Sequence, residues 1–189
     1  SWTKGDSEQG FQESDLIIEH TFSTQLAHQG YIEPHACVVE IDDADRVQIW
    51  ANNKGPFMLR DQLAAVWGLS KEQIRINPCS IGGDFGGKGS FMDVPLCYYL
   101  AFYSGRPVKM VMDYIQEFMA GNPRHPGIIT LKTGVKKDGR LWARQARVVF
   151  NSGAFGAFKP RVHLRGADHS GGPYRIPHVQ IDSYMVYTN

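Results

Sequence analysis

The chain has 189 residues, enough for one domain or two small ones, and its 42% hydrophobic residues suffice for a sizeable core. Its 20 basic and 19 acidic residues give a net charge of +1, so no cationic excess points to a nucleic-acid partner. No apolar run approaches the roughly 18 residues of a membrane span. Cys37, Cys79 and Cys97 form no C-x-x-C pair, which favours reduced thiols in a cytoplasmic setting over disulfides or a zinc site.

Residues 1–14 are polar and contain glycine, so we expect a flexible arm or linker there. Beyond it, alternating apolar residues predict strands and helically spaced apolar residues predict helices. Strands are expected at 16–22, 37–41, 46–50, 73–77, 107–112, 128–135, 141–150 and 179–187. Helices are expected at 57–67 and, mostly buried, at 92–103, with a helical turn at 114–119 and an undecided stretch at 152–170.

Hairpins alternate with strand–helix–strand units along the chain, which indicates an α+β fold with mixed β-sheets. No linker of distinct composition interrupts residues 15–189. We therefore expect a single domain over this range, or two lobes that divide near residue 124.

The segment 81–90 reads Ile-Gly-Gly-Asp-Phe-Gly-Gly-Lys-Gly-Ser and is the most informative stretch of the chain. Each of its glycines weakens a helix or strand by up to about 1 kcal/mol relative to Ala, so a loop is expected. A glycine loop between a strand and a helix directs free backbone N–H groups at an anion, often a phosphate. Three interpretations stay open at this point: a nucleotide-binding phosphate loop, a tight turn, and a cradle for a phosphate-bearing cofactor.

The nucleotide interpretation matches only in part. Gly82–Lys88 fits the first seven positions of G-x-x-x-x-G-K-[ST]. The eighth position, which holds magnesium through a hydroxyl, is Gly89, and Ser90 comes one residue late. Asp84 would also place a carboxylate where the triphosphate sits. These departures count against a nucleotide hydrolase.

Eight segments carry a resemblance to a known family, in that family's order. They are Tyr31–Ala36, Trp50–Phe57, Gly82–Lys88, Arg106–Lys109, Asn122–Pro126, Asp138–Gly139, Ser152–Phe155 and Gly172–Pro177. Together they extend over nearly all of residues 15–189. The chain resembles the molybdenum-binding large subunit of the xanthine dehydrogenase and aldehyde oxidase family, the molybdenum hydroxylases.

The resemblance implies a molybdopterin-binding domain of an oxidoreductase. Its cofactor would be molybdenum on molybdopterin, in bacteria usually the cytosine dinucleotide, with no metal ligand from the protein. The reaction would oxidise a heteroaromatic ring or an aldehyde with oxygen derived from water. The implied partners are the remainder of the molybdenum subunit, an iron–sulfur subunit and, in many members, a subunit that carries FAD.

The resemblance also assigns roles to the glycine loop. The cofactor-binding residues would be Gly82, Gly83, Asp84, Phe85, Gly86, Gly87 and Lys88. Glycines let backbone amides approach a flat pterin and its phosphates without a Cβ clash. Phe85 would lie close to the metal, with a backbone hydrogen bond from Gly86. The alternative for Phe85 is an anchor in the protein core.

Three positions depart from the family pattern. Lys54 stands where the family has a Gln that donates to the metal's oxo group; a Lys can still donate there and favour developing negative charge, or it can be a solvated loop residue. Asp84 replaces a glycine and would repel phosphate unless turned away or bonded to the loop's own amides. Gly89 replaces a Glu that contacts the purine in xanthine-oxidising members, which argues against xanthine-like recognition.

Three further residues are weaker candidates. We expect a structural role for His35 and a surface role for Arg165, whereas Lys88 either neutralises phosphate or caps the loop. The family's general-base Glu lies far downstream, and no equivalent occurs in residues 1–189. We therefore expect a fragment that is inactive alone. The competing hypotheses are a phosphate-loop nucleotide binder and a non-catalytic assembly domain, and the substrate is not revealed.

Overall fold

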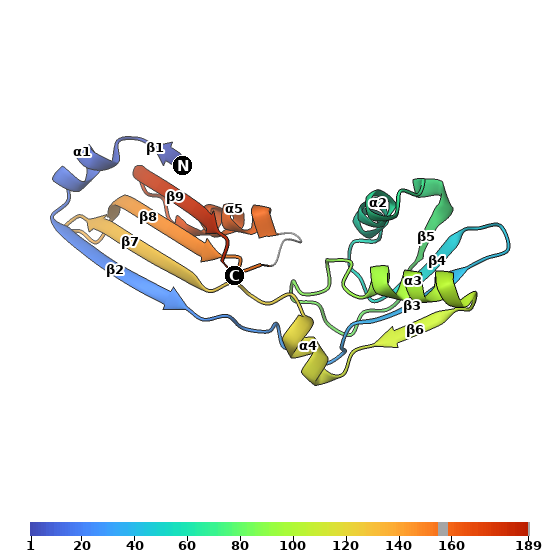
Figure 1. The fold of residues 1–189 in the computed structure, drawn as a ribbon. Coiled ribbons are helices and arrows are strands. Elements are labelled where there is room, and N and C mark those ends of the chain that lie inside the picture. Colours follow the sequence, from blue (N-terminus) through green and yellow to red (C-terminus); the bar gives the residue numbers. More distant parts are fainter. Residues whose placement is uncertain (155–158, 189) are drawn as a thin grey trace. The chain divides into compact units, whose positions relative to one another are not determined.

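A computed structural model describes residues 1–154 and 159–188 (Figure 1). The chain forms two compact units, here called the terminal unit (Ser1–Ala27 and His125–Asn189) and the central unit (His28–Arg124). Each unit contains one β-sheet with helices packed on it, so the predicted α+β fold with mixed sheets is confirmed. The chain leaves the terminal unit and returns to it, which adds a division after residue 27 to the one near residue 124.

The terminal unit is built on a five-stranded sheet in the order β1-β9-β8-β7-β2. Its elements are β1 (Trp2–Lys4), α1 (Ser7–Gln12), β2 (Leu16–Thr24), β7 (Gly127–Val135), β8 (Leu141–Asn151), α5 (Lys159–Ser170) and β9 (His178–Val186). β8 and β9 run parallel, whereas the other neighbours are antiparallel. Part of the undecided stretch 152–170 is thus helix α5; Phe155 lies outside the described residues.

The N-terminal residues differ from the flexible arm expected from their composition. β1 pairs with β9, with Trp2 opposite Ile181. The Asp6 carboxylate then caps α1 by accepting from the backbone N–H groups of its first turn. α1 lies so close to the sheet that a Cβ on Gly10 would be 2.7 Å from the His178 Cβ. The polar composition therefore reflects an exposed edge strand and a capped helix.

The central unit has a four-stranded sheet in the order β5-β4-β3-β6, in which only β4 and β5 are parallel. Its elements are β3 (Ala36–Ile41), β4 (Val47–Ala51), α2 (Pro56–Trp67), the 3-10 helix η1 (Lys71–Gln73), β5 (Ile74–Asn77), α3 (Val94–Ser104), β6 (Val108–Val111) and α4 (Tyr114–Ala120). α2 and α3 pack on the sheet face that carries Val39, Val47 and Ile49, and this layer forms the core. Gly68 and Gly105 end the two helices in the left-handed conformation.

Helix α3 departs from the expectation of a mostly buried helix. It buries Val94, Cys97, Tyr98 and Ala101 against the sheet, while its opposite face is exposed. Among residues 1–154 and 159–188, no helix is both long and apolar enough to cross a membrane.

Candidate cofactor-binding site

The glycine loop, residues 82–88, lies in the irregular connection between β5 and α3. Its backbone takes positive φ at Gly83 (94°), Phe85 (44°) and Gly86 (98°). Positive φ is open to glycine but costs an ordinary side chain free energy, so Phe85 is held in a strained conformation. α3 begins only at Val94, so the loop does not run directly into a helix as a phosphate loop does.

Asp84 holds the end of the loop together. Its carboxylate accepts from the backbone N–H of Gly86 at 2.9 Å and of Lys88 at 2.6 Å, and its carbonyl oxygen accepts from the N–H of Gly87 at 2.7 Å. Burial acts to raise the pKa of the Asp84 carboxyl, but hydrogen bonds from Lys54, Gly86 and Lys88 outweigh it and hold that pKa below its usual value. The carboxylate is therefore bonded to the loop's own amides, the condition under which it does not repel a phosphate.

Lys54 and Asp84, two of the departures from the family pattern, are partners. The Lys54 Nζ lies 2.8 Å from the Asp84 Oδ2, and the Lys54 backbone N–H donates to the carbonyl oxygen of Lys88 at 3.0 Å. The Lys54 side chain is 44% exposed, so it stands at the loop surface. Lys54 is therefore part of the loop's own hydrogen-bond network, and its ammonium is already paired with Asp84.

Lys88 supports the loop from its inner side. Its side chain is fully buried, with Nζ 2.6 Å from the Glu33 Oε2 and 4.8 Å from the centre of the Tyr31 ring. The buried ammonium is already paired with a carboxylate, so it caps the loop and is not presented to a phosphate. Of the two roles expected for Lys88, this arrangement suits the cap, and it does not favour the phosphate-loop interpretation, which needs a free lysine at a helix N-terminus.

At three of the four glycines, the protein beneath the loop leaves no room for a side chain. An added Cβ would lie 2.6 Å from Glu33 at Gly82, 2.9 Å from Tyr31 at Gly83 and 2.4 Å from Tyr31 at Gly87. These distances are far below van der Waals contact, so the loop rests directly on the segment that holds Tyr31 and Glu33. Of these four glycines, only Gly86 has no atom of the described residues within 4 Å of its added Cβ, so this position is open in the described part of the chain. Gly82, Gly83 and Gly87 therefore serve internal packing, which the sequence did not reveal.

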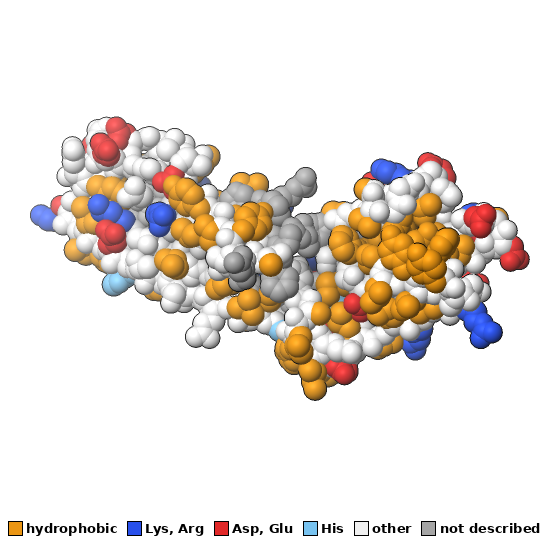
Figure 2. Space-filling view, viewed as in Figure 1, with side chains coloured by type: hydrophobic (Ala, Val, Ile, Leu, Met, Phe, Trp, Pro, Cys, Tyr) orange, Lys and Arg blue, Asp and Glu red, His pale blue; other side chains and the backbone are white. Residues whose placement is uncertain are grey.

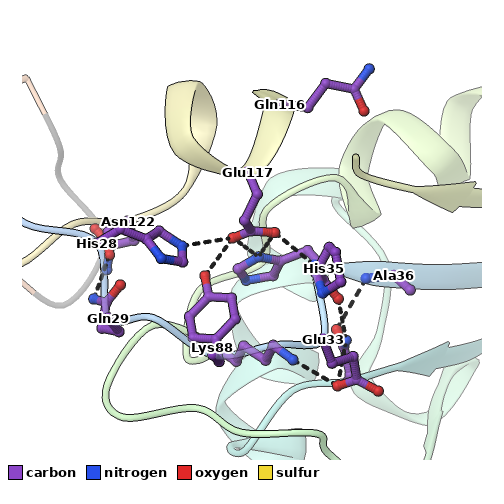
Figure 3. A network of polar contacts seen from close by, with 12 residues as sticks. His28, Gln29, Glu33, His35, Ala36, Lys88, Gln116, Glu117 and Asn122 are labelled. Carbon is purple, nitrogen blue, oxygen red and sulfur yellow. Dashed lines mark hydrogen bonds and ion pairs between the residues drawn. The ribbon is translucent and has the colours of Figure 1, made fainter. Parts of the chain in front are cut away.

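Glu117 of α4 holds the segment beneath the glycine loop in place, and Figure 3 shows its bonds to His35. The carboxylate is fully buried and accepts from the Tyr31 hydroxyl, from the His35 backbone N–H at 2.7 Å and from the His35 Nδ1 at 2.8 Å. His28 Nε2 lies 3.5 Å away. Burial acts to raise the pKa of Glu117, but the bonds from Tyr31 and His35 outweigh it and keep that pKa below its ordinary value.

Sequence reasoning missed Glu117 and the supporting role of Tyr31. The one available signal was a single carboxylate in the otherwise uncharged stretch Tyr114–Ala120. His35 is 6% exposed and bonded to Glu117, in agreement with a structural role. Arg165 is 81% exposed on α5 and lies 3.7 Å from the Asp168 carboxylate, in agreement with a surface role.

The other side of the glycine loop is open. Within the described residues, the backbone N–H groups of Gly83, Asp84 and Phe85 donate to no protein group. The Phe85 side chain is 62% exposed, so it is no core anchor, and its carbonyl oxygen is held by the Arg124 guanidinium at 2.7 Å. No group of three or more His, Cys, Asp or Glu side chains in residues 1–154 and 159–188 is placed to hold a metal ion.

The fold and loop define a known class of domain. The aldehyde oxidoreductase of Desulfovibrio gigas superposes with a TM-score of 0.92 at 28% identity, covering 98% of this chain and 21% of that one. The family model described as "Molybdopterin cofactor-binding domain" matches residues 1–189. The chain belongs to this family and is a molybdopterin-binding region of the xanthine dehydrogenase family.

Two curated relatives are similar over nearly the full chain. A probable xanthine dehydrogenase subunit of Bacillus subtilis is 35% identical over 188 residues, which are 100% of this chain and 25% of that protein. The nicotinate dehydrogenase large molybdopterin subunit of Eubacterium barkeri is 34% identical over 185 residues, which are 98% of this chain and 44% of that protein. The chain thus spans less than half the length of either relative.

The residues present fit the cofactor of this family. Three successive N–H groups have no acceptor among the described residues, and such a row suits anionic or carbonyl oxygens of a phosphate or pterin. The open side of Gly86 admits a flat group close to the backbone, where a Cβ would otherwise stand. The negative charge of Asp84 is offset by Lys54 and two amides, so it does not oppose an anion at the loop.

Proposed function

We propose that the glycine loop of this chain forms part of the cofactor site of a molybdenum hydroxylase that oxidises a heteroaromatic ring or an aldehyde with oxygen from water. The observation that carries the proposal is the two-sided loop. One side is fixed by Tyr31, Lys88 and Glu117, and the other presents unpaired amides beside an exposed Phe85. The relatives are named for xanthine, nicotinate and aldehyde, which supports these substrate classes.

The residues of this chain would bind and orient the cofactor. The amides of Gly83, Asp84 and Phe85 would donate to it, and the Phe85 ring would border it and exclude water from one side. The Lys54 ammonium would keep the loop closed through Asp84 and offer positive charge at the loop surface. The molybdenum cofactor, in its cytosine dinucleotide form, would supply the redox chemistry when bound.

The wider assembly belongs to the same proposal. Electrons would leave through iron–sulfur clusters and FAD on partner subunits, and residues 1–189 alone would not turn over substrate. Cys79 is an exposed free thiol, which suits a reducing cytoplasm. The nucleotide-binding alternative is not favoured, because Lys88 is buried against Glu33.

We expect Gly86→Leu to lower the molybdenum and pterin content of the complete molybdopterin subunit roughly tenfold, a loss of about 1.4 kcal/mol in binding. The new side chain would fill the open space over Gly86. Gly139→Leu is the matched control, because Gly139 also has positive φ, 86° against 98°, and nothing within 4 Å of its added Cβ. Metal analysis and pterin fluorescence of the purified proteins provide the readout. Equal cofactor content in the two variants would overturn the proposal.

A further inference from the structure

Helix α3 has two apolar faces. Its eleven residues include no charged side chain. The buried face repeats at helical spacing through Val94, Cys97, Tyr98 and Ala101. The opposite face has the same spacing and is exposed; we call it the α3 face, and it consists of Leu96 (55%), Tyr99 (43%), Leu100 (46%), Phe102 (57%) and Tyr103 (81%).

A helix that is apolar all round is typical of a position with protein on both sides. Single exposed apolar side chains need no explanation, but five large ones on successive turns form a patch. Figure 2 shows this patch as a continuous hydrophobic area over α3. Tyr98 is stacked on Trp67 at 4.0 Å, which fixes α3 against α2 and makes the exposed face a rigid surface.

The chemistry of the α3 face narrows the choice of what covers it. An eleven-residue helix is about 16 Å long, roughly half the thickness of a bilayer core, so this face is too short to match the lipid of a membrane span. A face without charged side chains is typical of a permanent interface and not of a transient one, whose composition is more polar. The occupant is therefore expected to be a polypeptide that stays bound.

The lengths of the relatives indicate where such a polypeptide can come from. The region similar to this chain makes up 25% of the Bacillus subtilis protein and 44% of the Eubacterium barkeri protein. Most of each of those proteins thus lies outside the region and is available to cover it. We propose that the α3 face packs against the remainder of the molybdopterin subunit, in a permanent apolar interface. The proposal rests on the family assignment and not on the glycine loop, so either can fail without the other.

Thiol labelling of the complete molybdopterin subunit tests this surface without any need for activity. In a Cys79→Ser background, which removes the exposed thiol of this region, Leu100→Cys and Tyr103→Cys report on the α3 face, with labelling quantified at their own peptides. Lys71→Cys is the control, because the Lys71 side chain is 52% exposed and its charge does not suit an apolar interface. We expect both reporters to react with a maleimide at least roughly tenfold more slowly than the control.

Two results would overturn the proposal. The first is that Leu100→Cys and Tyr103→Cys react as fast as Lys71→Cys in the molybdopterin subunit. If their labelling then slows when other subunits are added, a partner subunit covers the face. If their protection disappears on dilution, together with a change from dimer to monomer in gel filtration, a second copy of the subunit covers it. Protection that persists in the monomeric subunit supports packing within that subunit.

Discussion

Glu117→Leu is expected to cost about 3–5 kcal/mol in the free energy of unfolding. The substitution would leave the Tyr31 hydroxyl and two His35 donors buried without their acceptor. Tyr31 supports the glycine loop, so the loss is expected to extend to the site. Denaturant unfolding measures the effect, and Glu72→Leu, at an exposed carboxylate, is expected to change stability by no more than about 0.5 kcal/mol.

The pH dependence separates the charge of Glu117 from its shape. The pKa of Glu117 is lowered in the folded protein, so its contribution to stability is complete above the ordinary value of about 4.3 and is lost as the pH falls through the folded-state pKa. The conservative Glu117→Gln is therefore expected to be less stable than the parent at pH 6, with the difference shrinking towards pH 3. A constant difference over that range would contradict the buried carboxylate.

Gly87→Ala is expected to destabilise the protein by about 1–3 kcal/mol and to displace the glycine loop. The added methyl group would lie 2.4 Å from the Tyr31 Cε1 and 3.1 Å from its Cζ. The Tyr31 ring cannot move aside freely, because its hydroxyl is bonded to Glu117. Gly171→Ala is the control, because the nearest described atom to its added Cβ is the Ile181 Cδ1, at 4.0 Å.

A double-mutant cycle ties this effect to the proposed contact. Combining Gly87→Ala with Tyr31→Ala removes the clash, so the two unfolding penalties are expected not to add. Additive penalties would show that the Gly87 effect arises elsewhere in the loop. The same variants, measured for cofactor content, would show whether the inner packing of the loop is needed for binding.

Local patterns predicted the elements of the fold. Alternation in stretches such as 37–41 and the spacing of Leu59 and Leu63 gave strands and a helix close to those observed, and Gly68 and Gly105 marked helix ends. The prediction of a flexible N-terminal arm was wrong, because polar composition does not distinguish an exposed edge strand from a loose segment. The buried character of α3 was half right, because a fully apolar helix does not reveal which of its faces is covered by this part of the protein.

The glycine loop stood out in the sequence, but the contacts that its residues make did not. Lys54 and Asp84 were two separate departures from a pattern, and only the fold brings these residues, thirty positions apart, to 2.8 Å. Lys88 belongs to a phosphate-binding pattern by its spacing, yet Glu33 holds it inside the protein. Such pairings depend on long-range packing, for which a single sequence carries no periodic signal.

Residue-level hydrogen exchange of the complete subunit, with and without cofactor, tests the central claim that the open side of the glycine loop receives the cofactor. We expect the amides of Gly83, Asp84 and Phe85 to exchange more slowly when the cofactor is bound. The amides of Gly86 and Lys88, already bonded to Asp84, serve as internal controls and are expected to change little. Unchanged exchange at residues 83–85 in the loaded protein would contradict the account.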